Sequence, residues 1–266
     1  MCSLVVLKIH DHNASWSWLV ALWGLLLSLS ACGSAEDSQE HLSQLHVIGA
    51  STLPLVSLAS RPGEAPQVLE LTAYVALPPA IEVTSIEPLV DGSAVDFVSL
   101  SAQQIKVKKD SYSYQSYVGF QLLSFKVDLA VPENSALSFS AGSAQVRYGL
   151  SIKTAAEEEK FWGVFLVSPP GSPELGLVNP GVAISSPNSN KVVAANSEVE
   201  INAVFKEPPE EELQLAWFVS GGEIKNRRVA STSWKTKGPG RENLIFTARD
   251  RKHQSFSMDI VTVTVE

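Results

Sequence analysis

The chain has 266 residues, a formal net charge of −8 and 45% hydrophobic residues, enough apolar surface to bury a substantial core. Net acidity argues against general binding to nucleic acid, whose phosphates attract basic proteins. The two cysteines, Cys2 and Cys32, both lie near the start of the chain, which excludes a fold stapled by disulfide bonds beyond residue 32.

The first 31 residues have the pattern of an export signal. Lys8 is the one Lys or Arg before the apolar run WSWLVALWGLLLSL at 16–29, which is shorter than the roughly 20 residues of a membrane-spanning helix. The small residues Ser30 and Ala31 follow the run and lead into Cys32. The pattern predicts removal of residues 1–31, which leaves Cys32 as the lone cysteine.

Leu29-Ser30-Ala31-Cys32 resembles the lipobox of bacterial lipoprotein precursors. The resemblance implies that Cys32 becomes the new N-terminus and carries a covalent lipid, with no other cofactor. Two or more acyl chains make a durable membrane anchor. In that family an aspartate after the cysteine indicates inner-membrane retention, and Gly33 stands there, so the resemblance implies the outer membrane, on its periplasmic or surface face. The alternative is an ordinary secretory signal cut between Ala31 and Ala35.

The chain after the signal reads as β-structure. Residues 32–45 are small and polar, which predicts a flexible tether. From 46 to 168, short apolar or alternating segments are separated by turn residues, and no long segment has helical periodicity. This pattern predicts a β-sandwich domain with strands at 68–75, 81–86, 95–107, 117–131, 146–152 and 161–167.

A second sandwich domain is predicted over 182–266. Residues 169–181 are rich in proline and glycine, which favours a stiff linker before it. The predicted fold class is therefore all-β, with two antiparallel β-sandwich domains. The expected strands of the second domain are 182–184, 199–205, 213–219, 229–234, 244–248 and 258–265.

The second half also resembles immunoglobulin-like and PKD-like modules. The resemblance rests on the tryptophan-centred segment LAWFVSGG at 215–222, on Ala248-Arg249-Asp250 and on the terminal VTVTV. It implies that Trp217 is the core tryptophan of the sandwich. PKD modules carry aspartates after this tryptophan, and the present chain lacks them, so it departs from the strict PKD pattern.

We find no residue pattern that indicates catalysis or a bound metal. The chain has no Gly-x-Ser-x-Gly elbow, no paired histidines after the signal and no glycine-rich phosphate loop. The acidic runs 157–159 and 210–212 are interpreted as solvated loops, with calcium as the alternative. We therefore predict that the protein is not an enzyme.

Positive charge gathers late in this acidic chain. Between Gly221 and Lys252, nine Lys or Arg residues stand against three acidic residues. These side chains predict a basic patch for an acidic partner, although scattered solubilising charge is the alternative. Trp234 lies among them and is a candidate ring for stacking on a sugar. The residues proposed for the patch are Lys225, Arg227, Arg228, Lys235, Lys237 and Arg241.

The sequence predicts a lipid-anchored cell-envelope protein that acts as a non-catalytic binding or scaffolding module. Its expected partners are the membrane, through Cys32, and an envelope protein or acidic polymer. The first alternative is an accessory protein that binds carbohydrate or cell-wall polymer through Trp234. A hydrolase with a site split between the domains is a third reading, with no residue in its favour.

Overall fold

The computed structural model describes residues 42, 44–53, 56–90, 98–139, 142–172, 181–206, 213–250 and 255–266. The chain divides into two compact units, 1–39 and 40–266, and the first lies outside the described residues. The predicted export signal and Cys32 therefore also lie outside them. None of the helical segments in the described part has the length and hydropathy of a membrane span.

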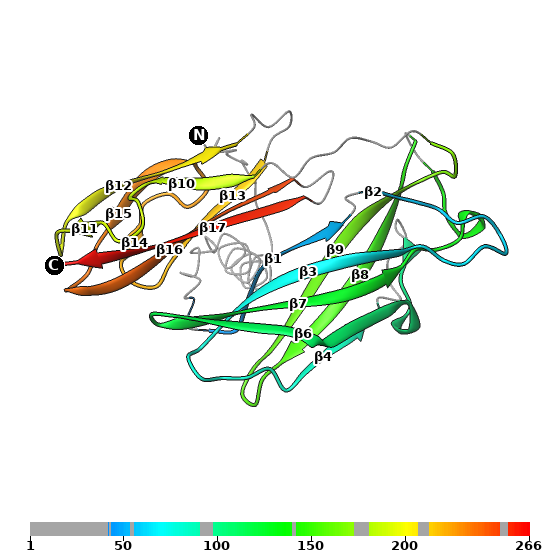
Figure 1. Ribbon diagram of the computed structural model, residues 1–266, viewed down its shortest axis with the longest axis horizontal. Helices are drawn as coiled ribbons and strands as arrows, with labels where there is room; N and C mark the ends of the chain where they lie inside the picture. Colours follow the sequence, from blue (N-terminus) through cyan, green and yellow to red (C-terminus); the bar gives the residue numbers. More distant parts are fainter. Residues whose placement is uncertain are drawn as a thin grey trace, which may run out of the picture. The chain divides into compact units, whose positions relative to one another are not determined.

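The predicted all-β class is confirmed, since the described residues form strands and two short 3-10 turns, η1 (Ala102–Gln104) and η2 (Asn134–Ala136). The first half of the fold pairs its strands in the orders β1-β3-β7-β6 and β2-β9-β8-β4, with β5 beside β8 (Figure 1). Its strands are β1 (His46–Leu53), β2 (Val56–Leu58), β3 (Val68–Leu77), β4 (Ser85–Leu89), β5 (Val98–Ser99), β6 (Ile105–Tyr117), β7 (Phe120–Ala130), β8 (Ala144–Lys153) and β9 (Glu158–Ser168).

The second half pairs its strands in the orders β10-β12-β15-β14 and β11-β17-β16-β13. This division matches the two sheets of an immunoglobulin-like sandwich, so the predicted immunoglobulin-like domain is confirmed. The strands are β10 (Val182–Ser186), β11 (Val192–Val193), β12 (Glu198–Phe205), β13 (Leu213–Val219), β14 (Glu223–Ile224), β15 (Ser231–Lys235), β16 (Gly240–Asp250) and β17 (Phe256–Val265).

The two halves share one topology. The sheet β1-β3-β7-β6 corresponds strand by strand to β10-β12-β15-β14. In each half the short second strand, β2 or β11, runs parallel to the last strand, β9 or β17. The first half differs by adding β5 and by the longer β6. The structure thus contains an internal repeat that the two dissimilar sequences do not reveal.

Each sandwich has its own apolar core, built by period-two alternation. In β7, for example, Leu123, Phe125, Val127 and Leu129 are all fully buried between the sheets of the first half. In the second half, the Trp217 ring packs on Phe246 with 4.7 Å between ring centroids, and its Nε1 donates to the Val229 carbonyl at 2.8 Å. Trp217 is therefore the core tryptophan, as predicted.

In each sandwich, two side chains on or directly before the last strand accept hydrogen bonds from the first strand and from the residue directly before it. In the first half, the backbone N–H groups of Leu45 and Val47 donate to Glu157 and Glu159 at 3.0 and 2.9 Å. In the second half, Gly181 and Ile184 donate in the same way to side chains two residues apart on β17. These acceptors are Ser257 Oγ at 3.1 Å and Asp259 Oδ2 at 2.7 Å.

The equivalence extends to the irregularity of each first strand. The β1 ladder shifts register after Val47, and the β10 ladder shifts after Ile184, in each case directly beyond the residue bonded to a carboxylate. Two carboxylates of the acidic run 157–159 thus satisfy backbone donors. The third, Glu158, accepts a hydrogen bond from Ser151 Oγ. The run therefore has a structural role, which differs from the solvated loop expected from the sequence. The second acidic run, 210–212, lies outside the described residues.

A third buried cluster lies between the two sandwiches, within the unit 40–266. It joins the outer face of β1, β3 and β7 to the outer face of β13, β16 and β17. Asn243 adds a polar contact, because its Nδ2 donates to the Val118 carbonyl at 3.1 Å. We call this cluster the junction. Its buried members are Leu42, Ile48, Ala76, Phe120, Leu122, Phe218, Ile245 and Phe256.

The junction corrects the expected extent of the tether. The sequence suggested a flexible segment up to Leu45, but Leu42 is 1% exposed and belongs to the junction. Leu45 is buried in the core of the first sandwich. The proposed tether is therefore packed at Leu42 and Leu45, because these leucines contribute to two apolar clusters. Residues 32–41 and 43 of the proposed tether and residues 173–180 of the proposed linker lie outside the described residues.

Candidate functional site

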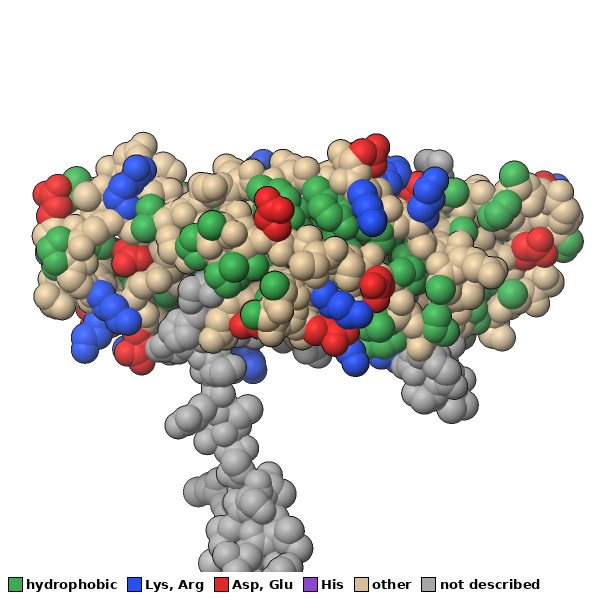
Figure 2. All heavy atoms as spheres, turned by 90° about the horizontal axis from the view of Figure 1, so that it is seen from below, with side chains coloured by type: hydrophobic (Ala, Val, Ile, Leu, Met, Phe, Trp, Pro, Cys, Tyr) green, Lys and Arg blue, Asp and Glu red, His purple; other side chains and the backbone are tan. Residues whose placement is uncertain are grey.

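The structure does not gather the predicted basic residues into one patch. Lys235 lies between Glu198 and Glu223 in the ladder of its sheet, so two carboxylates flank its charge. Arg227 lies beside β13, where its carbonyl accepts from the Trp217 N–H at 3.0 Å. On the face seen in Figure 2, Lys and Arg side chains are interspersed with Asp and Glu. A partner-binding role for these residues remains a prediction.

The same residues also divide along the strand direction. Arg227 and Arg228 precede β15, whereas Lys237 and Arg241 follow it, and the five residues of β15 span about 13 Å. Lys225 lies opposite Ser233 within that span, since its N–H donates to the Ser233 carbonyl at 3.0 Å. The basic count in the sequence therefore overstates the positive charge at any one place.

The expectation that Trp234 presents a half-exposed ring is wrong. Trp234 is fully buried, and its Nε1 donates to the Gly221 carbonyl at 2.9 Å. It lies on β15 between two outward residues, Ser233 and Lys235, and so points into the core. A sugar cannot stack on this ring while the sandwich is folded.

The described residues offer no evident centre for metal or proton chemistry. No three His, Cys, Asp or Glu side chains gather there in a group that would hold a metal ion. His46, the one histidine in the described part, lies 3.4 Å from Glu159 and 5.8 Å from the Phe218 ring centroid at the junction. Its surroundings are those of a structural contact between the sandwiches.

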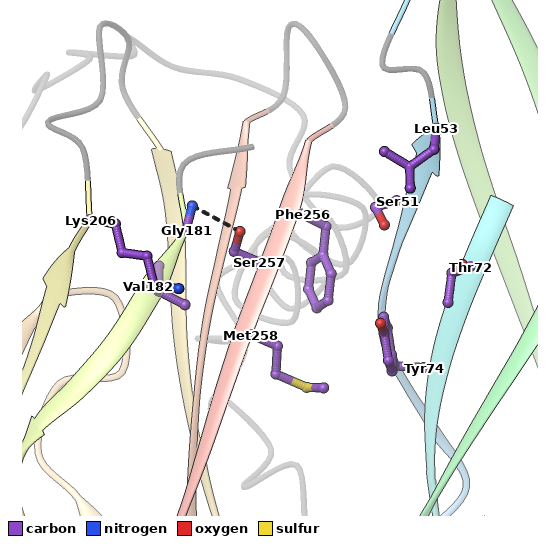
Figure 3. Close-up of a pocket in the computed structure, with 10 residues that line it drawn as sticks. All are labelled: Ser51, Leu53, Thr72, Tyr74, Gly181, Val182, Lys206, Phe256, Ser257 and Met258. Atoms are coloured by element: carbon purple, nitrogen blue, oxygen red, sulfur yellow. Dashed lines mark hydrogen bonds between the residues drawn. The ribbon is translucent and has the colours of Figure 1, made fainter. Parts of the chain in front are cut away.

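A cleft of about 390 Å³ opens beside the junction (Figure 3). This volume lies within the range of small-ligand sites, about 300–1,000 Å³, and such sites occur preferentially where domains meet. Residues of β1 and β3 form one wall. Residues of β10 and β17, together with the residues that directly precede β10 and follow β12, form the other. The lining residues are Ser51, Leu53, Thr72, Tyr74, Gly181, Val182, Lys206, Phe256, Ser257 and Met258.

Hydroxyl groups form one wall of this cleft. Ser51 lies directly opposite Thr72 in the β1–β3 ladder, and Tyr74 follows on the same face of β3. Side chains at such opposed positions lie about 4.5–5.5 Å apart at Cβ. Within the described part of the chain, no hydrogen bond engages the hydroxyls of Ser51, Thr72 or Tyr74. The described residues therefore leave these three hydroxyls without a hydrogen-bond partner.

Lys206 supplies the positive charge of the opposite wall. It is the one charged side chain among the ten described lining residues. Its stem lies across Gly181, where an added Cβ would come within 3.1 Å of Lys206 Cδ. Lys206 N–H donates to the Gly181 carbonyl at 3.0 Å, and Gly181 N–H donates to Ser257 Oγ at 3.1 Å. These contacts hold the lysine at the edge of the cleft.

Phe256 closes the cleft on the junction side. Its ring lies against Gly49, where an added Cβ would be 2.1 Å from Phe256 Cε2, and its centroid lies 5.9 Å from that of Tyr74. Phe256 is 4% exposed, so it forms a floor and offers no open ring face. The register shift of β1 falls at this glycine. The position of the ring therefore depends on a glycine in the opposite sandwich.

Charged residues continue the same face of the first sandwich beyond the hydroxyl wall. Glu70 contacts Lys126 at 2.6 Å and Lys108 at 3.2 Å, and Lys108 also contacts Asp128 at 2.7 Å. Hydrogen bonds from Lys126 and then Lys108 hold the pKa of Glu70 below its ordinary value. This ion pairing stabilises the fold fully when the pH is above the ordinary pKa of a glutamate. The stabilisation is lost as the pH falls through the lowered pKa of Glu70.

Sequence reasoning missed the cleft residues because they come from five strands or strand ends with no shared motif. One signal was visible. The pairs Trp217-Phe218 and Ile245-Phe246 place apolar side chains on both faces of their strands, and a half-exposed strand does not do this. Such strands predict that the outer face of their sheet is covered by another part of the chain. The cleft lies beside the junction, where this contact is made.

Comparison with known proteins adds only weak likenesses. No protein-family model matches the chain, and no curated protein matches it. The fibronectin(III)-like modules of Clostridium thermocellum CbhA align at 15% identity and a TM-score of 0.31, over 82% of this chain and 94% of that one. These scores are too low to support any inference about function.

Two further solved structures give similar values. The PKD domain of human KIAA0319 aligns at 20% identity and a TM-score of 0.27, over 36% of this chain and 92% of that one. The tandem Ig repeats of Dlar align at 10% identity and a TM-score of 0.25, over 84% and 98%. The immunoglobulin-like description of the chain therefore rests on its own sheet topology.

Proposed function

We propose that this protein is a non-catalytic binding module of the bacterial cell envelope, tethered to the outer membrane by a lipid on Cys32. The cleft beside the junction is its binding site. The observation that carries this proposal is the convergence of one lysine and three hydroxyls on a cleft between two packed sandwiches, where no described residue engages the hydroxyls of Ser51, Thr72 and Tyr74. The envelope location is supported by the lipobox-like sequence before Cys32.

The second candidate function is binding of carbohydrate or cell-wall polymer, and we propose the cleft as its site in place of Trp234. Trp234 is buried and cannot supply a stacking surface. The cleft instead combines hydroxyl groups with apolar side chains such as Val182 and Met258. Hydroxyls both donate and accept hydrogen bonds, as sugars do, so this lining favours a polyhydroxylated ligand over a purely apolar one.

The anchor is tested by replacing Cys32. In bacterial cells that process lipoproteins, Cys32→Ser should move the protein from the membrane to the soluble fraction, because no acyl chain is attached. Fractionation and immunoblotting measure the change. Cys2→Ser is the matched control and should leave the protein in the membrane, since Cys2 lies in the removed segment. Unchanged membrane association of Cys32→Ser would contradict the anchor.

The binding site is tested by filling the cleft. Thr72→Trp places an indole between Ser51 and Tyr74, and we expect it to abolish capture of envelope material by the immobilised protein, as measured by mass spectrometry and sugar analysis. Thr264→Trp is the control, since Thr264 is also on the outer face of a strand but does not line the cleft. Equal capture by the two variants would reject the cleft as the site.

A further inference from the structure

We infer that the ligand of the cleft is a saccharide that carries a carboxylate, with Lys206 facing the carboxylate and the wall of Ser51, Thr72 and Tyr74 facing the sugar hydroxyls. This inference rests on the proposed function, because it assumes that the cleft is the binding site. It adds the charge and the chemical class of the ligand.

The sign of the ligand follows from the lining. Among the ten described lining residues, Lys206 has the only charge, and none is acidic. An ammonium group recognises a carboxylate by a charge-assisted hydrogen bond, roughly twice as strong as a neutral one. A cationic ligand would instead place its positive charge next to the positive charge of Lys206. The lining therefore selects an anion.

The placement of Lys206 limits where the charge of the ligand lies. Its stem rests on Gly181, which has a φ of +49°, a left-handed conformation that glycine adopts readily. Because the Lys206 backbone is bonded to the same glycine, the ammonium group extends from a fixed base. The carboxylate is therefore expected on the side of the ligand that faces β10 and β12, away from β1.

The class of the ligand follows from the opposite wall. Ser51, Thr72 and Tyr74 present hydroxyls that no described residue engages. A free carboxylate alone would leave this wall without partners, whereas a sugar ring has hydroxyls on its rim and C–H groups on its faces. The half-buried Tyr74 ring and the Met258 side chain provide apolar surface for those C–H groups (Figure 3). A carboxylated saccharide satisfies both walls.

The experiment uses the soluble Cys32→Ser chain and two matched probes, a galacturonate trimer and its methyl ester, in which methylation removes the charge of the carboxylates. By calorimetry or NMR titration, the acid should bind about tenfold or more tightly than the ester, as expected for one charge-assisted hydrogen bond. Lys206→Met keeps the stem and should remove this preference. Lys191→Met is the control, an exposed lysine outside both the cleft and the predicted basic patch, and should change nothing.

The outcomes distinguish failure of the acidic-saccharide inference from failure of the proposed binding site. Equal binding of acid and ester, an unaffected Lys206→Met variant or a loss with Lys191→Met would overturn the acidic-saccharide inference. If neither probe binds but capture still depends on Thr72, the inference fails and the proposed function stands. If the acid binds and Thr72→Trp leaves that binding unchanged, the site is elsewhere and both fail.

Discussion

Replacing Trp217 with alanine should destabilise the protein by about 3–5 kcal/mol, the usual cost of removing a large buried aromatic side chain. The ring is fully buried against Phe246, and its loss leaves both a cavity and the Val229 carbonyl without its donor. The next residue, Phe218, belongs to the junction, so the damage should extend to the contact between the sandwiches. Urea unfolding followed by far-UV circular dichroism measures the loss.

Two companion variants separate the sources of this loss. Trp217→Phe retains most of the ring but removes the donor to Val229, so it should cost less than alanine. Trp162→Ala removes a half-buried tryptophan from the outer face of β9 and should cost the least. If Trp217→Ala and Trp162→Ala were equally stable, Trp217 would not be the core tryptophan that the structure indicates.

The second sandwich was predicted well because its strands follow simple rules. The run VTVTV alternates in β17, with Val261, Val263 and Val265 buried and Thr262 and Thr264 facing out. The segment around Trp217 is apolar and bounded by turn residues, as β13 requires. Local pattern alone therefore specified these strands.

The first sandwich was predicted less completely, and β6 shows why. Ile105–Tyr117 is the edge strand of its sheet, and its side chains are largely exposed, so lysines, serines and tyrosines replace apolar alternation. The expected strand at 95–107 is divided between β5, η1 and the start of β6. The β6 ladder also shifts register between Lys108 and Ser113, which no period-two pattern reveals.

The candidate site was not predictable from local patterns because contacts distant in sequence create it. Thr72 lies in β3 and Lys206 directly follows β12, neither within a recognisable motif, and only the packing of two sandwiches brings both to one cleft. The burial of Trp234, by contrast, could have been predicted from the local sequence. Ser233 and Lys235 face outward on β15, and the period of two directs the residue between them into the core.

The contact between Gly49 and Phe256 determines how the junction and the floor of the cleft fit together, and a double-mutant cycle tests it. Gly49→Ala places a methyl group 2.1 Å from the Phe256 ring, so we expect a loss of about 1–3 kcal/mol from overpacking. Phe256→Ala should cost about 3–5 kcal/mol, because the ring is 4% exposed within the junction. Urea unfolding of each variant gives the values.

The double variant should be more stable than the sum of the single losses predicts, since removing the ring leaves space for the new methyl group. Gly238→Ala is the matched control and should be nearly neutral, because an added Cβ meets no atom within 4 Å there. Both single variants should also weaken the capture that depends on Thr72, as the ring forms the floor of that cleft. Additive losses with intact capture would show that the sandwiches do not depend on this contact for their fit.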